Sequence, residues 1–289
     1  IGDFIGFAHA LQDARISMER LNDIHAQEDE EYDICNKLSL LPENGTITVR
    51  DLTYSYSGAE RDYAIKNLSL DIPEGKVTAI VGESGSGKTT LIKLLQGFYK
   101  PNSGTIKVGG IGLDCINPHL WRKSTGSVMQ ESYIFSDTIA KNIALSTDEV
   151  DVKRLYDSAL LANADEFISA LPLGYNTRIG MEGSGVSQGQ RQRLLIARAI
   201  YKNPKYLFFD EATNSLDATN ERIIMENLQK IFLNRTVVIA AHRLSTVMNA
   251  DSIVVMKKGE IVEQGTHSEL VALRGHYYTL VKNQLELGK

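Results

Sequence analysis

The spacing of apolar residues changes several times along the chain, and each spacing predicts a different element. Residues 1–27 carry apolar side chains in two series with a repeat of seven, which predicts one helix with a narrow apolar seam. The seam consists of Phe4, Phe7, Leu11, Ala14, Met18 and Leu21. It suits either a partner helix or a helix folded back onto its own domain, and the sequence leaves these alternatives open. The acidic run at 27–31 ends the pattern and is typical of a solvated linker.

Apolar and polar residues then alternate over 45–72, which predicts an antiparallel β region. A turn is expected near Ser57 and Gly58, where the alternation is interrupted. A further short strand is predicted at 105–110, and residues 137–172 are mostly helical in pattern.

Two continuous apolar runs, "YLFF" at 206–209 and "TVVIAA" at 236–241, differ from this alternation. Strands buried on both faces have no polar positions, so these runs predict parallel strands inside a sheet. A final pair of strands, 252–256 and 260–265, is separated by a turn at Lys258 and Gly259. Strands that alternate with helices predict an α/β fold, to which the antiparallel region is an annex.

The composition agrees with a globular protein that does not coat nucleic acid. The 289 residues are 43% hydrophobic and 23% charged, which is enough for a core and for one large or two small domains. The net charge of −5 argues against nucleic acid as a partner. Cys35 and Cys115 have neither metal-ligand nor redox-pair spacing, which indicates a reducing, intracellular compartment. No window is long enough to span a membrane and no signal peptide is visible, while the start at Ile1 suggests a piece of a longer protein.

The segment "VGESGSGKTT" at 81–90 carries the first candidate chemistry. An apolar run precedes it and a helical pattern follows, and in this context its spacing is that of a phosphate-binding P-loop. Glycines let the backbone curl around an anion, and a helix beginning near Gly87 directs unpaired N–H groups at it. Lys88 can bind the β- and γ-phosphates, and the Thr89 hydroxyl can bind Mg²⁺. A glycine-rich turn that binds nothing would not require the Gly-Lys-Thr ending. The predicted ATP-binding residues here are Gly82, Glu83, Ser84, Gly85, Ser86, Gly87, Lys88, Thr89 and Thr90.

A pair of carboxylates ends the first of the two apolar runs. In "YLFFDEATNSLD", Asp210 is placed to hold Mg²⁺ and Glu211 to act as a general base on an attacking water. An acidic strand end that only caps the next helix is the weaker alternative, because the pair lies downstream of a P-loop.

The segment "GSGVSQGQRQRLLIARAI" at 183–200 resembles the signature motif of ATP-binding cassette (ABC) ATPases. Ser187 can cap a helix whose N-terminus faces an anion. The resemblance implies that Ser187, Gly189 and Gln190 contact ATP held by a second copy of the domain. Val186 and Gln188 depart from the family pattern, which has Leu and Gly at these positions.

The resemblance extends over nearly the whole chain from residue 46 and implies further roles. It implies that Tyr56 stacks on adenine, that Gln130 contacts Mg²⁺ and senses the transport domain, and that His242 contacts the γ-phosphate. Asp217 matches the D-loop, which reaches the ATP site of the other copy. The implied catalytic residues are Glu211, His242 and Gln130, and the implied metal ligands are Thr89, Gln130 and Asp210. The implied fold is a P-loop (RecA-like) α/β core with an antiparallel β subdomain and an α-helical signature subdomain.

Three classes of function are compatible with a P-loop: the ATPase of a membrane exporter, an ABC-type ATPase of DNA repair or chromosome maintenance, and a P-loop switch or small-molecule kinase. The second class has long coiled-coil arms, yet no extended heptad run lies between Lys88 and Asp210. The third class lacks the signature helix. Only the exporter explains the leading seam helix.

We therefore expect 1–29 to be the cytosolic end of the last transmembrane helix with its linker, and 30–289 to be the ABC ATPase domain. The resemblance implies ATP and Mg²⁺ as cofactors, and an ATP-dependent homodimer as the active form. It also implies a transmembrane domain in the same polypeptide and a location on the cytoplasmic face of the inner membrane, the fragment itself being soluble. The stretch "GYNTRIGMEGSGVSQGQRQR" is most similar to bacterial exporters of peptides, bacteriocins and toxins, some of which carry a peptidase domain. A lipid or drug exporter is the alternative subclass.

Overall fold

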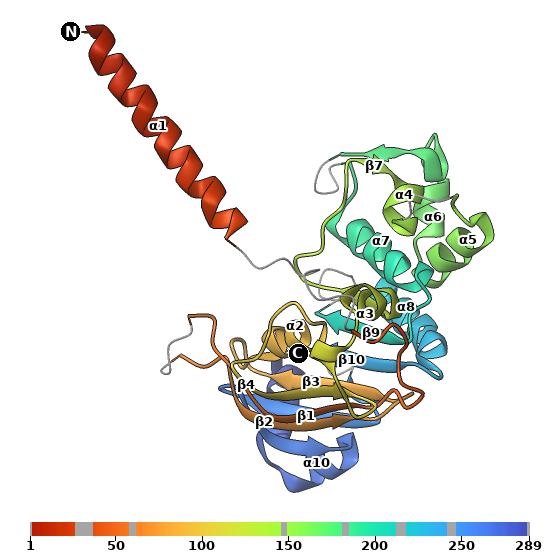
Figure 1. Cartoon of the computed structure of the whole chain (residues 1–289). Coiled ribbons are helices and arrows are strands. Elements are labelled where there is room, and N and C mark those ends of the chain that lie inside the picture. The colour runs from red at the N-terminus through yellow and green to blue at the C-terminus, as the bar shows by residue number, and fades with distance from the viewer. Residues whose placement is uncertain are drawn as a thin grey trace. The chain divides into compact units, whose positions relative to one another are not determined.

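The computed structural model describes residues 2–26, 37–57, 62–145, 149–180, 185–211, 218–241 and 247–287 (Figure 1). It divides into two units, Ile1–Lys37 and Leu38–Lys289. The predicted acidic linker at 27–31, Cys35 and Gly58 lie outside the described residues.

The first unit contains one helix, α1 (Gly2–His25), as the repeat of seven predicts. None of its residues is buried, and Phe4, Leu11 and Met18 of the seam are 77%, 62% and 71% exposed. Arg15 Nε and Glu19 Oε1 form an ion pair of 2.9 Å along the helix. Among the described helices, α1 included, none combines the length and the apolar character that a membrane span needs.

The second unit is built on a six-stranded sheet in the order β12-β11-β3-β10-β9-β6. Its strands are β3 (Val77–Gly82), β6 (Thr125–Val128), β9 (Tyr206–Asp210), β10 (Thr236–Ala240), β11 (Ser252–Lys257) and β12 (Glu260–Gly265). All neighbours pair in parallel except β11 and β12. Every residue of β9 and β10 is buried, which confirms the prediction from the continuous apolar runs. The hairpin at 252–265 is confirmed, and β6 is a strand that the pattern did not predict.

A second, four-stranded sheet has the order β2-β1-β4-β5 and consists of β1 (Ile47–Tyr54), β2 (Ile65–Ile72), β4 (Ser103–Val108) and β5 (Ile111–Gly112). Each of its pairings is antiparallel, as predicted for 45–72. One hydrophobic core joins this sheet, the helix α2 (Lys88–Leu95) and one face of the parallel sheet. Because α2 packs into this core through Leu91, Ile92 and Leu94, its first turn is held firmly.

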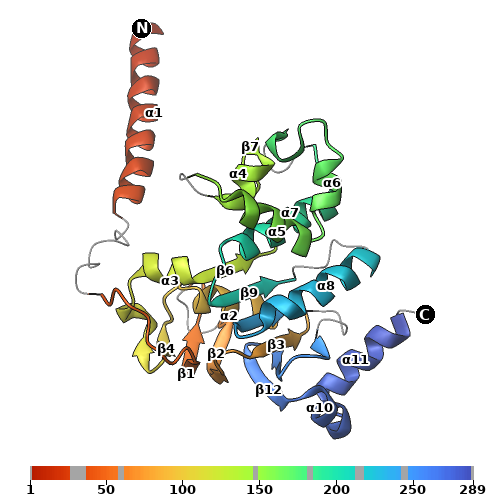
Figure 2. The same ribbon diagram turned by 90° about the vertical axis from the view of Figure 1, so that its right-hand side faces the viewer.

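The other face of the parallel sheet packs against helices in a separate hydrophobic core. These helices are α4 (Ile139–Ala144), α5 (Val152–Leu161), α6 (Asp165–Ser169), α7 (Gln188–Tyr201) and α8 (Ala218–Phe232). In both views α4, α5, α6 and α7 gather beyond the sheets (Figures 1 and 2), and short β7 (Asp137–Thr138) and β8 (Arg178–Ile179) pair beside them. The remaining described α-helices are α3 (Pro118–Ser124), α10 (His267–Leu273) and α11 (His276–Leu287). The predicted α/β core, antiparallel sheet and helical subdomain are confirmed.

Candidate functional site

The predicted phosphate and metal residues meet at one edge of the parallel sheet. Ile80 of β3 lies level with Ala240 of β10, which in turn lies level with Asp210 of β9. Val128 of β6 pairs with Phe209, so the chain leaves β6 beside Asp210. The loop 83–87 and Glu211 follow directly from these strand ends, and Gln130 lies two residues after the end of β6. Ligands of open parallel sheets bind at this carboxyl edge, so the topology collects the candidate residues where a ligand is expected.

Glycine shapes the loop between β3 and α2. Gly82 has a φ of 155° and Gly87 a φ of 103°, and α2 begins at Lys88 directly after Gly87. A Cβ on Gly87 would lie 2.6 Å from the Ala64 carbonyl oxygen, and one on Gly82 would meet the carbonyl oxygen of Met256. At these two positions the backbone therefore runs where no side chain fits. Gly87, the N-cap residue of α2, has no side chain to cap the first N–H groups of the helix, so a bound anion can satisfy them.

The Lys88 side chain reaches from the start of α2 back to this loop, and the residue is only 5% exposed. Its Nζ donates to the carbonyl oxygens of Gly82 at 2.9 Å and Glu83 at 3.0 Å. Burial lowers the pKa of Lys88, while the nearby carboxylates of Glu211 and Asp210 raise it. These two bonds from the ammonium group hold the loop in its curved shape. Phosphate oxygens would be stronger hydrogen-bond acceptors for the ammonium group than these two carbonyls.

Asp210 is a buried carboxylate at the end of β9 with 0% exposure. Neither of its oxygens has a hydrogen bond of normal geometry from the described residues. Burial raises the pKa of Asp210, and the Thr89 side chain nearby lowers it only in part. An unsatisfied buried carboxylate is costly, and hard cations such as Mg²⁺ prefer oxygen ligands of this kind. The residues at this edge therefore fit the predicted Mg²⁺ with its nucleotide.

Glu211 follows Asp210 in an unusual backbone conformation. Its φ is 53°, in the left-handed region, while its N–H still donates to the Ala240 carbonyl oxygen at 2.9 Å. Such a conformation costs of order 1–3 kcal/mol in a residue other than glycine and is concentrated at functional sites. The chain thus turns out of the sheet at the residue predicted to be the base.

Tyr56 lies beside the P-loop helix and is 57% exposed. Its hydroxyl shares a hydrogen bond of 3.0 Å with the Thr90 hydroxyl, so this threonine, predicted to bind ATP, has its side chain engaged with tyrosine. The rings of Tyr54 and Tyr99 lie within 5.5 Å of the Tyr56 ring. The sequence analysis singled out neither ring, although the pair "FY" at 98–99 after the helical pattern was a signal for an aromatic contact.

Gln130 is exposed in the turn that follows β6. Its neighbour Glu131 lies 4.0 Å from the Nζ of Lys93 on α2, and Lys93 also lowers the pKa of Asp210. Lys93 is a further residue that the sequence analysis missed.

The signature segment forms the N-terminus of α7, as predicted. Ser187 caps the helix by accepting from the Gln190 N–H at 3.2 Å, and the Gln190 side chain accepts from the Ser187 N–H at 2.8 Å. This capping box is a signature of helix starts. Gly189 lies in the first turn, and Gln188 is exposed as the first residue of the helix. The predicted cap is confirmed, and the Gln190 side chain is turned back onto Ser187.

Arginines of α7 hold the segment that follows Gln130. Arg191 donates to the Ser132 carbonyl oxygen at 2.7 Å. Arg198 donates to the Tyr133 carbonyl oxygen at 2.7 Å and to the Asn142 carbonyl oxygen at 2.8 Å. Burial lowers the pKa of Arg198 to about 10. The signature helix is thereby fastened to the chain that leaves Gln130, which the sequence did not indicate.

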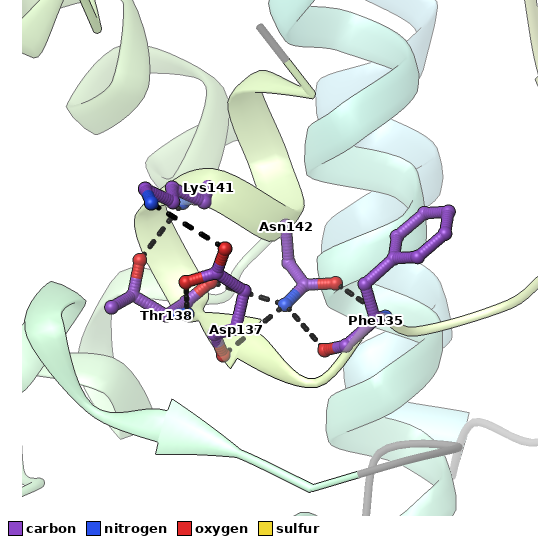
Figure 3. A network of polar contacts seen from close by, with 5 residues as sticks. All are labelled: Phe135, Asp137, Thr138, Lys141 and Asn142. Atoms are coloured by element: carbon purple, nitrogen blue, oxygen red, sulfur yellow. Dashed lines mark hydrogen bonds and ion pairs between the residues drawn. The ribbon is translucent and has the colours of Figure 1, made fainter. Parts of the chain in front are cut away.

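Asn142 is the hub of this polar network (Figure 3). Its side chain accepts from the Phe135 N–H at 2.8 Å and donates to the carbonyl oxygens of Phe135 at 2.9 Å and Thr138 at 3.1 Å. It is 1% exposed, so these bonds are shielded from water. Lys141 and Asp137 form an ion pair of 3.5 Å at the surface of the same turn. The network fixes the shape of 135–142.

Two predicted residues, Asp217 and His242, lie outside the described residues. The structure therefore brings together the P-loop, Asp210, Glu211, Gln130 and Tyr56 at one end of the second unit. Ser187, Gly189 and Gln190 are brought together separately at the start of α7.

Comparison with known proteins gives three kinds of match. The family model for ABC transporters matches residues 65–214. The leukotoxin translocation ATP-binding proteins LktB of Mannheimia haemolytica and Bibersteinia trehalosi are each 46% identical over 277 residues, covering 96% of this chain and 39% of those proteins. The structure of a bacterial Atm1-family ABC exporter with ATP bound matches with a TM-score of 0.87 and 33% identity, covering 96% of this chain and 49% of that chain. The chain thus spans less than half the length of these relatives.

Proposed function

This chain belongs to the ABC transporter family, and from that premise we propose that it is the ATP-hydrolysing part of a membrane exporter. The observation that carries the proposal is the buried Asp210 carboxylate, which has no hydrogen bond of normal geometry from the described residues. It ends the strand that pairs with β6 and β10, beside the P-loop at the end of β3. A cation bound at this carboxylate would offset the cost of burying it.

In the proposed site the loop 83–87 and the N-terminus of α2 bind the phosphates of ATP. Lys88 exchanges its bonds to the Gly82 and Glu83 carbonyls for phosphate oxygens. The exposed ring of Tyr56 stacks on the adenine, which fixes the other end of the nucleotide.

The metal ligands are proposed to be Asp210, the Thr89 hydroxyl and Gln130, and Mg²⁺ when bound neutralises charge on the phosphates. Glu211 accepts the proton of the attacking water. His242 is proposed to contact the γ-phosphate, in line with its place in the family motif.

The active form is proposed to be a homodimer that closes on two ATP molecules. Ser187, Gly189 and Gln190 would reach the ATP of the other copy, together with Asp217. The exposed N-terminus of α7 supports this role. Ser187 accepts a hydrogen bond from the Gln190 N–H of the same motif, and the helix start remains accessible.

The partner within the full protein is proposed to be a transmembrane domain at the cytoplasmic face of the inner membrane. The relatives are longer than this chain and are named as translocation or exporter proteins. Two exposed apolar features support a contact with such a partner: the seam of α1, and the side chains of Tyr133, Phe135 and Leu145, which are 39%, 48% and 55% exposed. Tyr133 and Phe135 lie in the segment that follows Gln130, so a change at Gln130 can be passed to that contact.

The cargo is proposed to be a peptide or protein. The support is the 46% identity to proteins named for leukotoxin translocation, against 33% to the Atm1-family exporter.

The test of the proposed ATPase is phosphate release at saturating Mg·ATP over a range of protein concentrations. We expect the rate per chain to rise with concentration, because each site needs the partner's α7. The Glu211→Gln variant should be at least about a hundredfold slower, the scale of losing a general base. It should also dimerise with ATP in sedimentation. Glu260→Gln, which makes the same change on the edge strand β12, is the matched control and should retain the full rate.

Two results would count against the proposal. Normal turnover in Glu211→Gln would remove this residue from the role of base. A rate per chain that is independent of protein concentration would contradict a site shared between two copies.

A further inference from the structure

Three tyrosines from separate segments meet beside the P-loop helix. Tyr54 is the last residue of β1, Tyr56 lies two residues on, and Tyr99 follows the end of α2. The rings of Tyr54 and Tyr99 stack with centroids 5.3 Å apart and an interplanar angle of 22°. The Tyr56 ring stands nearly perpendicular to both, at 81° and 85°, with centroids 5.1 Å and 5.5 Å away. These are favourable aromatic geometries, so the three rings restrain one another.

A hydrogen bond restrains the outer end of Tyr56. Its hydroxyl lies 3.0 Å from the Thr90 hydroxyl in the first turn of α2, and Thr90 is 7% exposed. The side chain is thus held at the ring by two tyrosines and at its tip by the P-loop helix, although 57% of it is exposed to solvent. An exposed side chain with this many restraints has lost most of its rotational freedom before any ligand binds.

We propose that Tyr99 and Thr90 are positioning residues that hold the Tyr56 ring ready to stack on the adenine of ATP. This inference rests on the proposed function, in which the chain binds ATP and Tyr56 contacts the base. Ordering a mobile aromatic side chain costs affinity when it happens on binding, and a ring that is already ordered avoids that cost. Tyr99 lies just beyond the C-terminus of α2 and Thr90 lies in its first turn. Both restraints therefore fix the position of the Tyr56 ring relative to the helix that binds the phosphates.

Loss of the restraint should weaken binding of the base and leave binding of the phosphates nearly unchanged. This difference can be measured with ligands that have or lack the base. The Tyr99→Leu variant removes the perpendicular ring contact while keeping an apolar side chain. We expect its affinity for Mg·ATP to fall about two- to tenfold, the equivalent of losing one aromatic pair. Affinity for inorganic tripolyphosphate, which has no base, should change less than about twofold. Tyr99→Phe keeps the ring and should restore most of the ATP affinity.

The measurement is calorimetric titration of each variant with Mg·ATP and with Mg·tripolyphosphate, preceded by a thermal melt to establish folding. A second readout is the fluorescence of 2-aminopurine riboside triphosphate, which is quenched when the base stacks and should be quenched less in Tyr99→Leu. The matched control is Tyr156→Leu. It removes a similar perpendicular pair, Tyr156 with Tyr175 at 4.6 Å, from the helical subdomain.

The outcomes separate the inference from the proposed function. A wild-type chain that binds neither ATP nor the 2-aminopurine analogue would overturn both. If the wild type binds ATP but Tyr99→Leu weakens ATP and tripolyphosphate equally, Tyr99 only supports the fold and the inference is wrong. An unchanged ATP affinity and unchanged quenching in Tyr99→Leu would also overturn it. Selective loss of ATP affinity, absent from Tyr156→Leu, supports it.

Discussion

Replacing Asp210 by asparagine should make the nucleotide-free protein more stable while removing its response to Mg²⁺. The carboxylate is fully buried and has no hydrogen-bond partner of normal geometry among the described residues. Asparagine has nearly the same shape and carries no charge. The substitution therefore removes the cost of burying an ion without opening a cavity.

The size of the gain follows from the desolvation of a buried, unsatisfied group. Such a group costs about 1–3 kcal/mol, and more when it is charged. Asparagine is itself polar and Lys88 loses a favourable charge, so we expect a net gain near the lower end, about 1 kcal/mol. For a chain of this size that gain corresponds to an increase of about 2 °C in melting temperature.

The pH dependence of the folding stability gives the sign of the Asp210→Asn effect independently. Burial raises the pKa of Asp210 in the folded protein above its ordinary value. The folded state therefore binds this proton more tightly than the unfolded state does, and the ionised group opposes folding. Its destabilising effect is absent below the ordinary pKa of aspartate and grows as the pH rises through the raised value. The stability difference between Asp210→Asn and the wild type should be small in acid and widen toward neutral pH.

The assay is denaturant unfolding of both proteins at several pH values, with and without Mg·ATP. At a ligand concentration of 100 times Kd the wild type should gain about 2.7 kcal/mol, and the variant should gain clearly less. Asp71→Asn is the control, because the Asp71 side chain is half-exposed and forms a surface ion pair of 2.8 Å with Arg50. An apo variant that is less stable than the wild type at neutral pH would refute the view of Asp210 as an unsatisfied charge.

Three further predictions concern other parts of the site. Lys88→Met should weaken Mg·ATP binding by about 1.5–3 kcal/mol in calorimetry, since hydrogen bonds to a charged group are lost; an unchanged affinity would contradict its role. Ser187→Asp should keep the helix cap and the melting temperature but abolish ATP-dependent dimerisation, whereas Ser187→Ala should lose about 1 kcal/mol of stability; sedimentation and melting separate the two effects. Asn142→Ala should cost about 2–4 kcal/mol in denaturant unfolding, because several buried backbone groups lose their partner, and a cost below about 1 kcal/mol would show that water replaces it.

Local patterns in the sequence were sufficient for much of the fold. The runs at 206–209 and 236–241 predicted buried parallel strands because burial on both faces leaves no polar position. Ser187 predicted a helix start because a cap depends on residues within one turn of each other. Structural features that depend only on residues close together in the sequence could be predicted in this way.

The strand β6 shows where local reasoning failed. It has four residues, of which Gly126 and Ser127 have little strand preference. A Cβ on Gly126 would lie 2.7 Å from the Pro204 side chain and 3.1 Å from the Ala199 carbonyl oxygen. The glycine therefore permits a close approach between β6 and the end of α7. That requirement comes from segments far along the chain and leaves no periodic signal.

The arginines of α7 illustrate the same limit at the site. Arg191 and Arg198 are seven residues apart and share one face of the helix, whereas Arg193 lies on the opposite face. The sequence could assign these faces but not what covers them. In the structure the first two hold the segment after Gln130, while Arg193 donates to the Asn163 carbonyl oxygen at 2.8 Å.

The chemistry of these three side chains is identical, so only the tertiary fold decides that two of them join the start of α7 to the chain leaving Gln130. Gln130 is proposed to serve the ATP site of its own chain, and Ser187 the site of the partner. The bonds of Arg191 to Ser132 and of Arg198 to Asn142 are short and partly buried, and the bond of Arg198 to Tyr133 is short and exposed. The start of α7 and the segment after Gln130 therefore cannot shift independently without breaking these bonds. A substitution that loosens this face should therefore disturb both sites of a dimer, whereas one at Arg193 should affect stability alone.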